Sequence, residues 1–69
     1  MGLTQKQLDE IFDFIKNSKF ESMSHTDIDD NDYSVTATEI DGIKTLTFTS
    51  VKTLDQTIYD NTHGMWEKL

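Results

Sequence analysis

Cysteine and arginine are absent from this chain of 69 residues. Without cysteine, no disulfide can brace the fold, and no thiolate can act as a nucleophile or hold a metal. No apolar stretch approaches the roughly 20 residues of a membrane span, and no basic start leads into an apolar run of the kind that marks a secretory signal. These absences predict one soluble, cytoplasmic domain with no membrane partner.

Positive charge is also scarce. The chain carries six basic residues, all of them lysine, against thirteen acidic residues, which gives a net charge of −7. Affinity for DNA or RNA depends on Lys and Arg that neutralise phosphates, so direct nucleic-acid binding is disfavoured. The same repulsion disfavours anionic membranes. The natural complement of this chain is a basic surface on another protein.

Motifs for catalysis and for metal binding are missing as well. His25 and His63 lie far apart in the sequence, have no cysteine partners, and do not stand in a nucleophile motif. A domain of this size offers little room for a ligand pocket beside a packed core. We therefore expect no enzymatic activity, no cofactor and no metal site.

Residues 4–17 carry the clearest helix signal. Thr4 and Gln7 have the spacing of a capping box, and Leu3 and Leu8 have the spacing of a hydrophobic staple. The apolar positions recur at the helical period; they are Leu8, Ile11, Phe12 and Ile15. Phe14 lies on the flank of this stripe. The pattern predicts an amphipathic helix from Thr4 to Asn17.

A β-hairpin is predicted for residues 33–51, because Asp41-Gly42 separates two strand-like runs and is a favoured type I′ turn. With Ile40 opposite Ile43, side chains separate cleanly between two faces, and a one-residue slip would mix them. The predicted pairs on the apolar face are Tyr33 with Ser50, Val35 with Phe48, Ala37 with Leu46, and Glu39 with Lys44. Threonine and serine fill the other face.

Two further segments have weaker patterns. Residues 20–28, from Phe20 to Ile28, predict a first strand. From Thr53 onward the sequence favours a helix, because Thr53 and Gln56 form a second possible capping box. Apolar residues also gather on one helical face, with Tyr59 and Trp66 at its edge; they are Leu54, Ile58, Met65 and Leu69. The alternative is a second hairpin of residues 57–60 and 65–69.

The predicted fold class is α+β, a small two-layer domain of order α-β-(β)-β-α. An antiparallel sheet carrying Val35, Leu46 and Phe48 packs against the N-terminal amphipathic helix. Two layers around one core are the smallest stable arrangement for such elements. The chain is expected to form one domain over residues 1–69.

The acidic run Asp27-Ile28-Asp29-Asp30-Asn31-Asp32 resembles the start of a calcium loop, with oxygen ligands at its first, third and fifth positions. The match then fails. Asp32 stands where a glycine should make the sharp turn, and Thr38 stands where a bidentate Glu belongs. The run is therefore interpreted as a solvated acidic turn, and weak, non-specific association of cations with its carboxylates is the alternative.

The function predicted from these patterns is a stoichiometric inhibitor or regulator that docks on a basic surface of a larger protein. Acids on the helix and in the turn would steer the encounter, and two aromatic residues of the tail would be apolar anchors. The candidate partner-binding residues are Asp9, Glu10, Asp13, Asp27, Asp29, Asp30, Asp32, Tyr59 and Trp66.

In size, charge and mixed α/β build, the chain resembles small acidic proteins of phages and mobile elements that block restriction, repair or CRISPR nucleases. Carboxylates two residues apart on a strand lie about 6.8 Å apart, close to the phosphate spacing of a nucleic-acid strand. This resemblance implies a DNA mimic whose partner is a nucleic-acid enzyme. The alternative is an assembly module or homodimer, formed through the Thr-rich face or the tail, in which charge serves only solubility.

Overall fold

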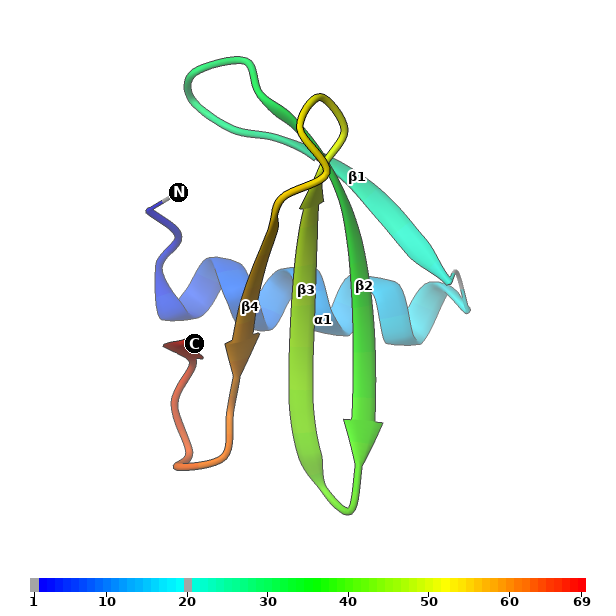
Figure 1. Ribbon diagram of the computed structural model, residues 1–69. Helices are drawn as coiled ribbons and strands as arrows, with labels where there is room; N and C mark the ends of the chain where they lie inside the picture. The colour runs from blue at the N-terminus through cyan, green and yellow to red at the C-terminus, as the bar shows by residue number, and fades with distance from the viewer. Residues whose placement is uncertain (1, 20) are drawn as a thin grey trace.

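The computed structural model describes residues 2–19 and 21–69. It contains one helix and one five-stranded antiparallel sheet whose strands lie in sequence order (Figure 1). The elements are α1 (Gln5–Ser18), β1 (Ser22–Thr26), β2 (Asp32–Ile40), β3 (Ile43–Ser50), β4 (Gln56–Asp60) and β5 (Glu67–Lys68). The α+β class and the first strand are confirmed; Phe20, where that strand was expected to begin, lies outside the described residues. Among the described residues, no helix has the length and apolar character needed to cross a membrane.

The predicted helix cap is present. Thr4 is the N-cap; its hydroxyl accepts a hydrogen bond from the backbone N–H of Gln7 at 3.1 Å. The Gln7 side chain accepts one from the N–H of Thr4 at 2.9 Å, so both partners satisfy an otherwise unpaired amide. The helix buries Leu8, Phe12 and Ile15, and its charged residues are exposed.

The central hairpin has the predicted register over its whole length. Ile40 lies opposite Ile43, and each predicted pair from Tyr33 with Ser50 to Glu39 with Lys44 is observed. Asp41 and Gly42 have φ values of 53° and 79°, as a type I′ turn requires at its two central positions. The turn chemistry and the alternation of side chains therefore determine the register together.

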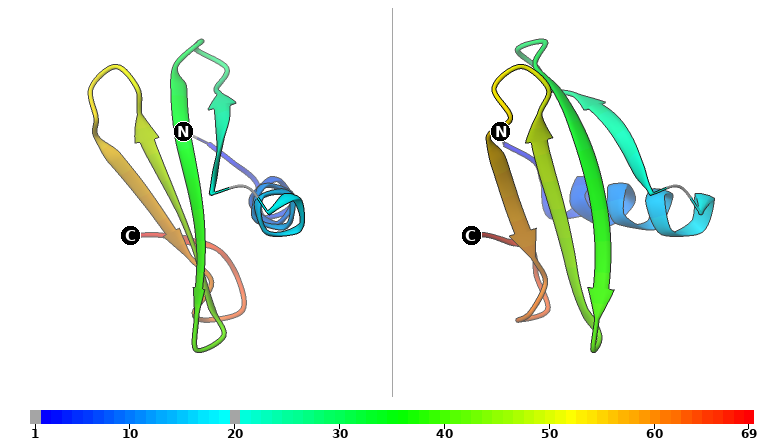
Figure 2. Two further views of the ribbon diagram at one scale, coloured as in Figure 1. Left: turned by 90° about the vertical axis from the view of Figure 1, so that its right-hand side faces the viewer. Right: turned by 45° about the vertical axis from the view of Figure 1, so that its right-hand side comes forward.

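The helix and the inner face of the sheet share one hydrophobic core. Its members are Leu8, Phe12, Ile15, Val35, Leu46, Phe48, Tyr59 and Trp66. Figure 2 shows α1 on one side of the sheet. Phe48 is fully buried, and the rings of His25, Tyr33 and Tyr59 meet it edge-on at centroid distances of 5.9, 6.4 and 5.7 Å. Such edge-to-face pairs add to the stability gained from burial.

The favoured helix after Thr53 was wrong, and the alternative hairpin forms instead. β4 pairs with β3 and β5 pairs with β4, so a helix that would end the α-β-(β)-β-α order is replaced by two more strands. The predicted helical face does not exist, since Leu54 and Leu69 are exposed while Tyr59 and Trp66 are buried. The open edge of β3 offers hydrogen bonds and an apolar surface that outweigh local helical preference.

An exposed His–Glu pair joins the β4–β5 connection to β5, with Nδ1 of His63 2.8 Å from a carboxylate oxygen of Glu67. This hydrogen bond, followed by the negative charges of Glu67 and Asp60, raises the pKa of His63 above its ordinary value. A raised pKa in the folded state means that the pair stabilises the fold fully below the ordinary pKa of about 6.5. That contribution is lost as pH rises through the folded-state pKa.

We therefore expect Glu67→Gln to lower the thermal midpoint at pH 5.5 and to have less effect at pH 8.5. The measurement is a pair of melting series by circular dichroism over this pH range. Glu39→Gln is the matched control, because Glu39 faces Lys44 and no histidine. An equal effect of Glu67→Gln at both pH values would contradict the role of this pair.

Candidate functional site

The acids predicted to bind a partner are divided among separate places in the structure. Asp9 contacts the C-terminal tail, and Asp13 is exposed on α1. Glu10, Asp27 and Asp29 lie around a groove between α1 and β1, whereas Asp29, Asp30 and Asp32 line a hollow beside the β3–β4 loop. The helix and the turn thus do not form one continuous acidic face.

Asp9 has an internal structural partner. Its carboxylate accepts a hydrogen bond of 2.7 Å from the indole Nε1–H of Trp66. One turn earlier, the Gln5 amide holds the backbone of the same residue, accepting from the Trp66 N–H at 2.6 Å and donating to the Trp66 C=O at 2.8 Å. One turn later, the Phe12 ring lies 5.8 Å from the Trp66 ring. One stripe of α1 therefore holds the C-terminal tail.

The two aromatic residues proposed as partner anchors are core residues. Trp66 is 3% exposed and Tyr59 is 6% exposed. A side chain so deeply buried offers no surface to a partner, so the partner-binding assignment of this pair is corrected. Of the two residues, Trp66 joins the tail to α1, and Tyr59 packs on Phe48.

Asp27 organises its own turn. One of its carboxylate oxygens accepts from the backbone N–H groups of Asp29 and Asn31, and the other accepts from the Asn31 amide and the Tyr33 hydroxyl. These bonds, led by that from the Asn31 N–H, lower the pKa of Asp27. Both carboxylate oxygens of Asp27, the residue at the first position of a calcium loop, thus already accept hydrogen bonds. The described residues contain no group of three or more His, Cys, Asp or Glu side chains placed to hold a metal ion.

The acidic turn and the β3–β4 loop lie at the same end of the sheet (Figure 1). The backbone N–H of Val51 donates to the C=O of Asp32 at 3.0 Å and joins them. Together they line a hollow of about 370 Å³. We call residues 28–32 and 51–55 the loop-end surface. Exposed carboxylates, Val51 and Lys52 line the hollow together, and Ile28 and Leu54 are further exposed apolar side chains on the same two loops.

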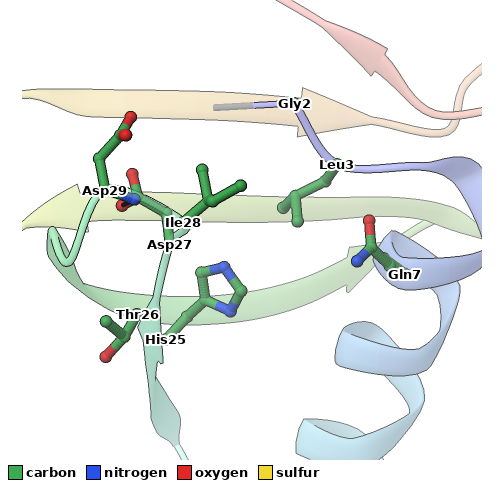
Figure 3. Close-up of a pocket in the computed structure, with 8 residues that line it drawn as sticks. All are labelled: Gly2, Leu3, Gln7, His25, Thr26, Asp27, Ile28 and Asp29. Carbon is green, nitrogen blue, oxygen red and sulfur yellow. Dashed lines mark hydrogen bonds between the residues drawn. The ribbon is translucent and has the colours of Figure 1, made fainter.

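A second concave feature, which the sequence did not predict, lies between α1 and β1. Two hollows of about 370 and 250 Å³ share Leu3, Gln7 and His25. We call this continuous feature the α1–β1 groove. Figure 3 shows Leu3 and Ile28 facing one another across its wider part. The sequence signal was Phe14, which lies on the flank of the core stripe and is 51% exposed.

No known protein family, no curated protein and no solved structure matches this chain.

The contacts of Trp66 generate a stability prediction. Gln5→Ala leaves the partly buried N–H and C=O of Trp66 without side-chain partners, so we expect a loss of about 1–3 kcal/mol in the free energy of unfolding. Urea unfolding measures this loss through the fluorescence of Trp66, the one tryptophan of the chain. The control is Lys6→Ala, at the adjacent exposed position, which we expect to change stability by less than about 0.5 kcal/mol. Equal stabilities of the two variants would show that the Gln5 contacts contribute nothing.

Proposed function

We propose that this protein is a stoichiometric binding protein, an inhibitor or regulator that docks its loop-end surface on a basic surface of a larger protein. The observation that carries this proposal is the combination, on two joined loops, of exposed carboxylates with exposed apolar side chains. Interfaces combine apolar anchors with charges that steer the encounter. The loop-end surface offers both to a partner.

The carboxylates of this surface, Asp29, Asp30, Asp32 and Asp55, outnumber its one lysine, Lys52, which lines the same hollow, so the surface is net negative and attracts cations. Within the described part of the chain, no ion pair joins Asp29, Asp30 or Asp32 to a lysine. The chain as a whole carries −7, so its own field reinforces theirs. Lysine and arginine side chains of a partner would therefore be drawn to this end of the sheet.

Leu54 supports an interface at the same place. It has φ of 66°, a left-handed conformation that costs a bulky residue roughly 1–2 kcal/mol, and its side chain is 73% exposed. The loop is nevertheless well ordered by hydrogen bonds, since Leu54 N–H donates to Ser50 C=O at 2.9 Å and Ser50 N–H to Asp55 C=O at 2.8 Å. Backbone strain of this kind is often kept for function, and an apolar anchor explains a leucine where asparagine or glycine would fit better.

The partner surface we favour is one that otherwise binds nucleic acid. Such surfaces hold Lys and Arg in number, and the carboxylates of a rigid turn can occupy positions that phosphates would take. In this proposal the protein mimics a nucleic acid and has no catalytic role. The alternative hypothesis is a homodimer that forms through the Thr-rich face of the sheet, which α1 does not cover.

The first test removes the charge of the loop-end surface. The protein is immobilised, bacterial lysate is applied, and bound proteins are eluted in steps of salt. We expect Asp30→Asn with Asp32→Asn, which line only this hollow, to weaken capture of the main salt-sensitive partner about 2- to 30-fold, because each exposed charge contact is worth about 0.2–1 kcal/mol.

The matched control is Glu39→Asn with Asp41→Asn, which makes the same charge change at the β2–β3 turn, at the opposite end of the sheet (Figure 1). Equal losses for both double variants would mean that net charge, and not this surface, drives binding. A salt-insensitive interaction, or recovery of the protein's own copies alone, would support the homodimer instead.

The second test uses Leu54→Asn, which keeps the left-handed backbone and removes the apolar anchor. We expect the free energy of unfolding to rise by about 1 kcal/mol, because asparagine tolerates this conformation better. Partner capture should nevertheless weaken. Val51 stays unchanged in this variant, so an unaltered partner affinity would show that Leu54 is not an anchor.

A further inference from the structure

The α1–β1 groove combines an apolar floor with an open sheet edge. Leu3, Ile11 and Phe14 line it from the helix side, and Met23 and His25 line it from β1. Leu3, Ile11 and Met23 are partly buried against the core, so they form a firm floor. Figure 2 shows that β1, the first strand of the sheet, is displaced toward α1 relative to β2, β3 and β4. The groove therefore runs alongside an edge strand.

The edge of β1 lacks the usual protection against strand pairing. β1 is the first strand of the sheet order, so one of its edges has no neighbouring strand among the described residues. Its sequence, Ser-Met-Ser-His-Thr, has neither the lysine nor the proline that commonly blocks an exposed edge. Five residues of strand extend about 17 Å, which suits pairing with a short extended peptide.

The negative charges around the groove favour a positively charged occupant. Glu10 borders the narrower hollow, and Asp27 and Asp29 border the wider one. Of the described residues, no lysine lines either hollow. A bound segment therefore meets negative charge at both ends of an apolar floor, and a basic segment with apolar residues complements it.

We propose that the α1–β1 groove binds an extended, basic and apolar peptide segment of a partner protein, which adds a strand to the open edge of β1. Main-chain hydrogen bonds to β1 provide affinity, and alternate apolar side chains of the peptide enter the groove. Lysine or arginine residues at the ends of the segment face Glu10 and Asp29. A second copy of this chain is a poor occupant, because two bodies of −7 repel one another.

This inference goes beyond the proposed function, since the groove shares with the loop-end surface only residues of the acidic turn. It names a separate surface with its own mode of recognition. The surfaces can be tested independently through residues that belong to one of them alone, such as Glu10 for the groove and Leu54 for the loop-end surface.

The probe is the blocked heptapeptide Lys-Leu-Thr-Leu-Thr-Leu-Lys, and its control carries Glu in place of both Lys. Each peptide is titrated into the ¹⁵N-labelled protein, and amide shifts are followed by NMR. We expect saturable shifts in residues 22–26 and slower hydrogen exchange in β1 with the basic peptide. The acidic peptide should bind at least about tenfold more weakly, since its charges repel the carboxylates around the groove.

A pair of charge reversals on α1 provides the matched variants. Glu10→Lys should weaken the basic peptide about threefold to tenfold, whereas Asp13→Lys, at an exposed helix position outside both hollows, should change it less than about twofold. Both positions are exposed, so both variants should fold.

Four outcomes would overturn the proposal. They are the absence of saturable shifts, shifts confined to residues 51–55, equal affinity for the two peptides, and equal effects of the two variants. A dimer seen by sedimentation without peptide, with slow hydrogen exchange in β1, would assign the strand edge to a second copy instead. Leu54→Asn separates the two proposals, because Leu54 belongs to the loop-end surface alone. We expect this variant to bind the basic peptide as the unaltered protein does, even where it captures the lysate partner more weakly.

Discussion

The fold depends above all on the contacts that Trp66 makes with α1. This small chain has no disulfide, so non-covalent contacts alone must hold its two ends together. Gln5 binds the backbone of Trp66 across a sequence separation of 61 residues, and Asp9 binds its indole. These bonds, with the packing of Phe12 on the indole ring, place the C-terminal tail against the first element of the fold. Because these contacts use one side of α1, the opposite side faces away from the tail and lines the groove.

The surface chemistry follows from the same arrangement. Carboxylates that looked equivalent along the chain differ once their neighbours are known: Asp9 accepts from an indole, and Asp27 accepts from its own turn. Asp29 and Asp30 remain exposed at the loop tip, and Glu10 stands beside the groove. The internally bonded acids order the backbone, and the exposed acids give the ordered surface its charge. Some acids of this chain are thus part of the internal hydrogen bonding, and others remain as surface charge.

Local interactions made much of the fold predictable. The capping box of Thr4 and Gln7 involves residues three apart, and the register of the hairpin follows from Asp41-Gly42 and from strict alternation beside it. The tail was predicted wrongly for the opposite reason. Its strand conformation depends on the edge of β3 and on the burial of Tyr59 and Trp66, and neither is encoded in the local pattern of residues 53–69.

The candidate surfaces divide in the same way. Composition and short-range periodicity are enough to predict the net charge of −7, the position of the acidic turn and the apolar stripe of the helix. Tertiary structure alone decided that Trp66 is an internal residue, that the acidic turn meets the Leu54 loop, and that Phe14 and Met23 share a groove. Each of these depends on segments distant in sequence being brought together by the core, and no local pattern specifies such contacts.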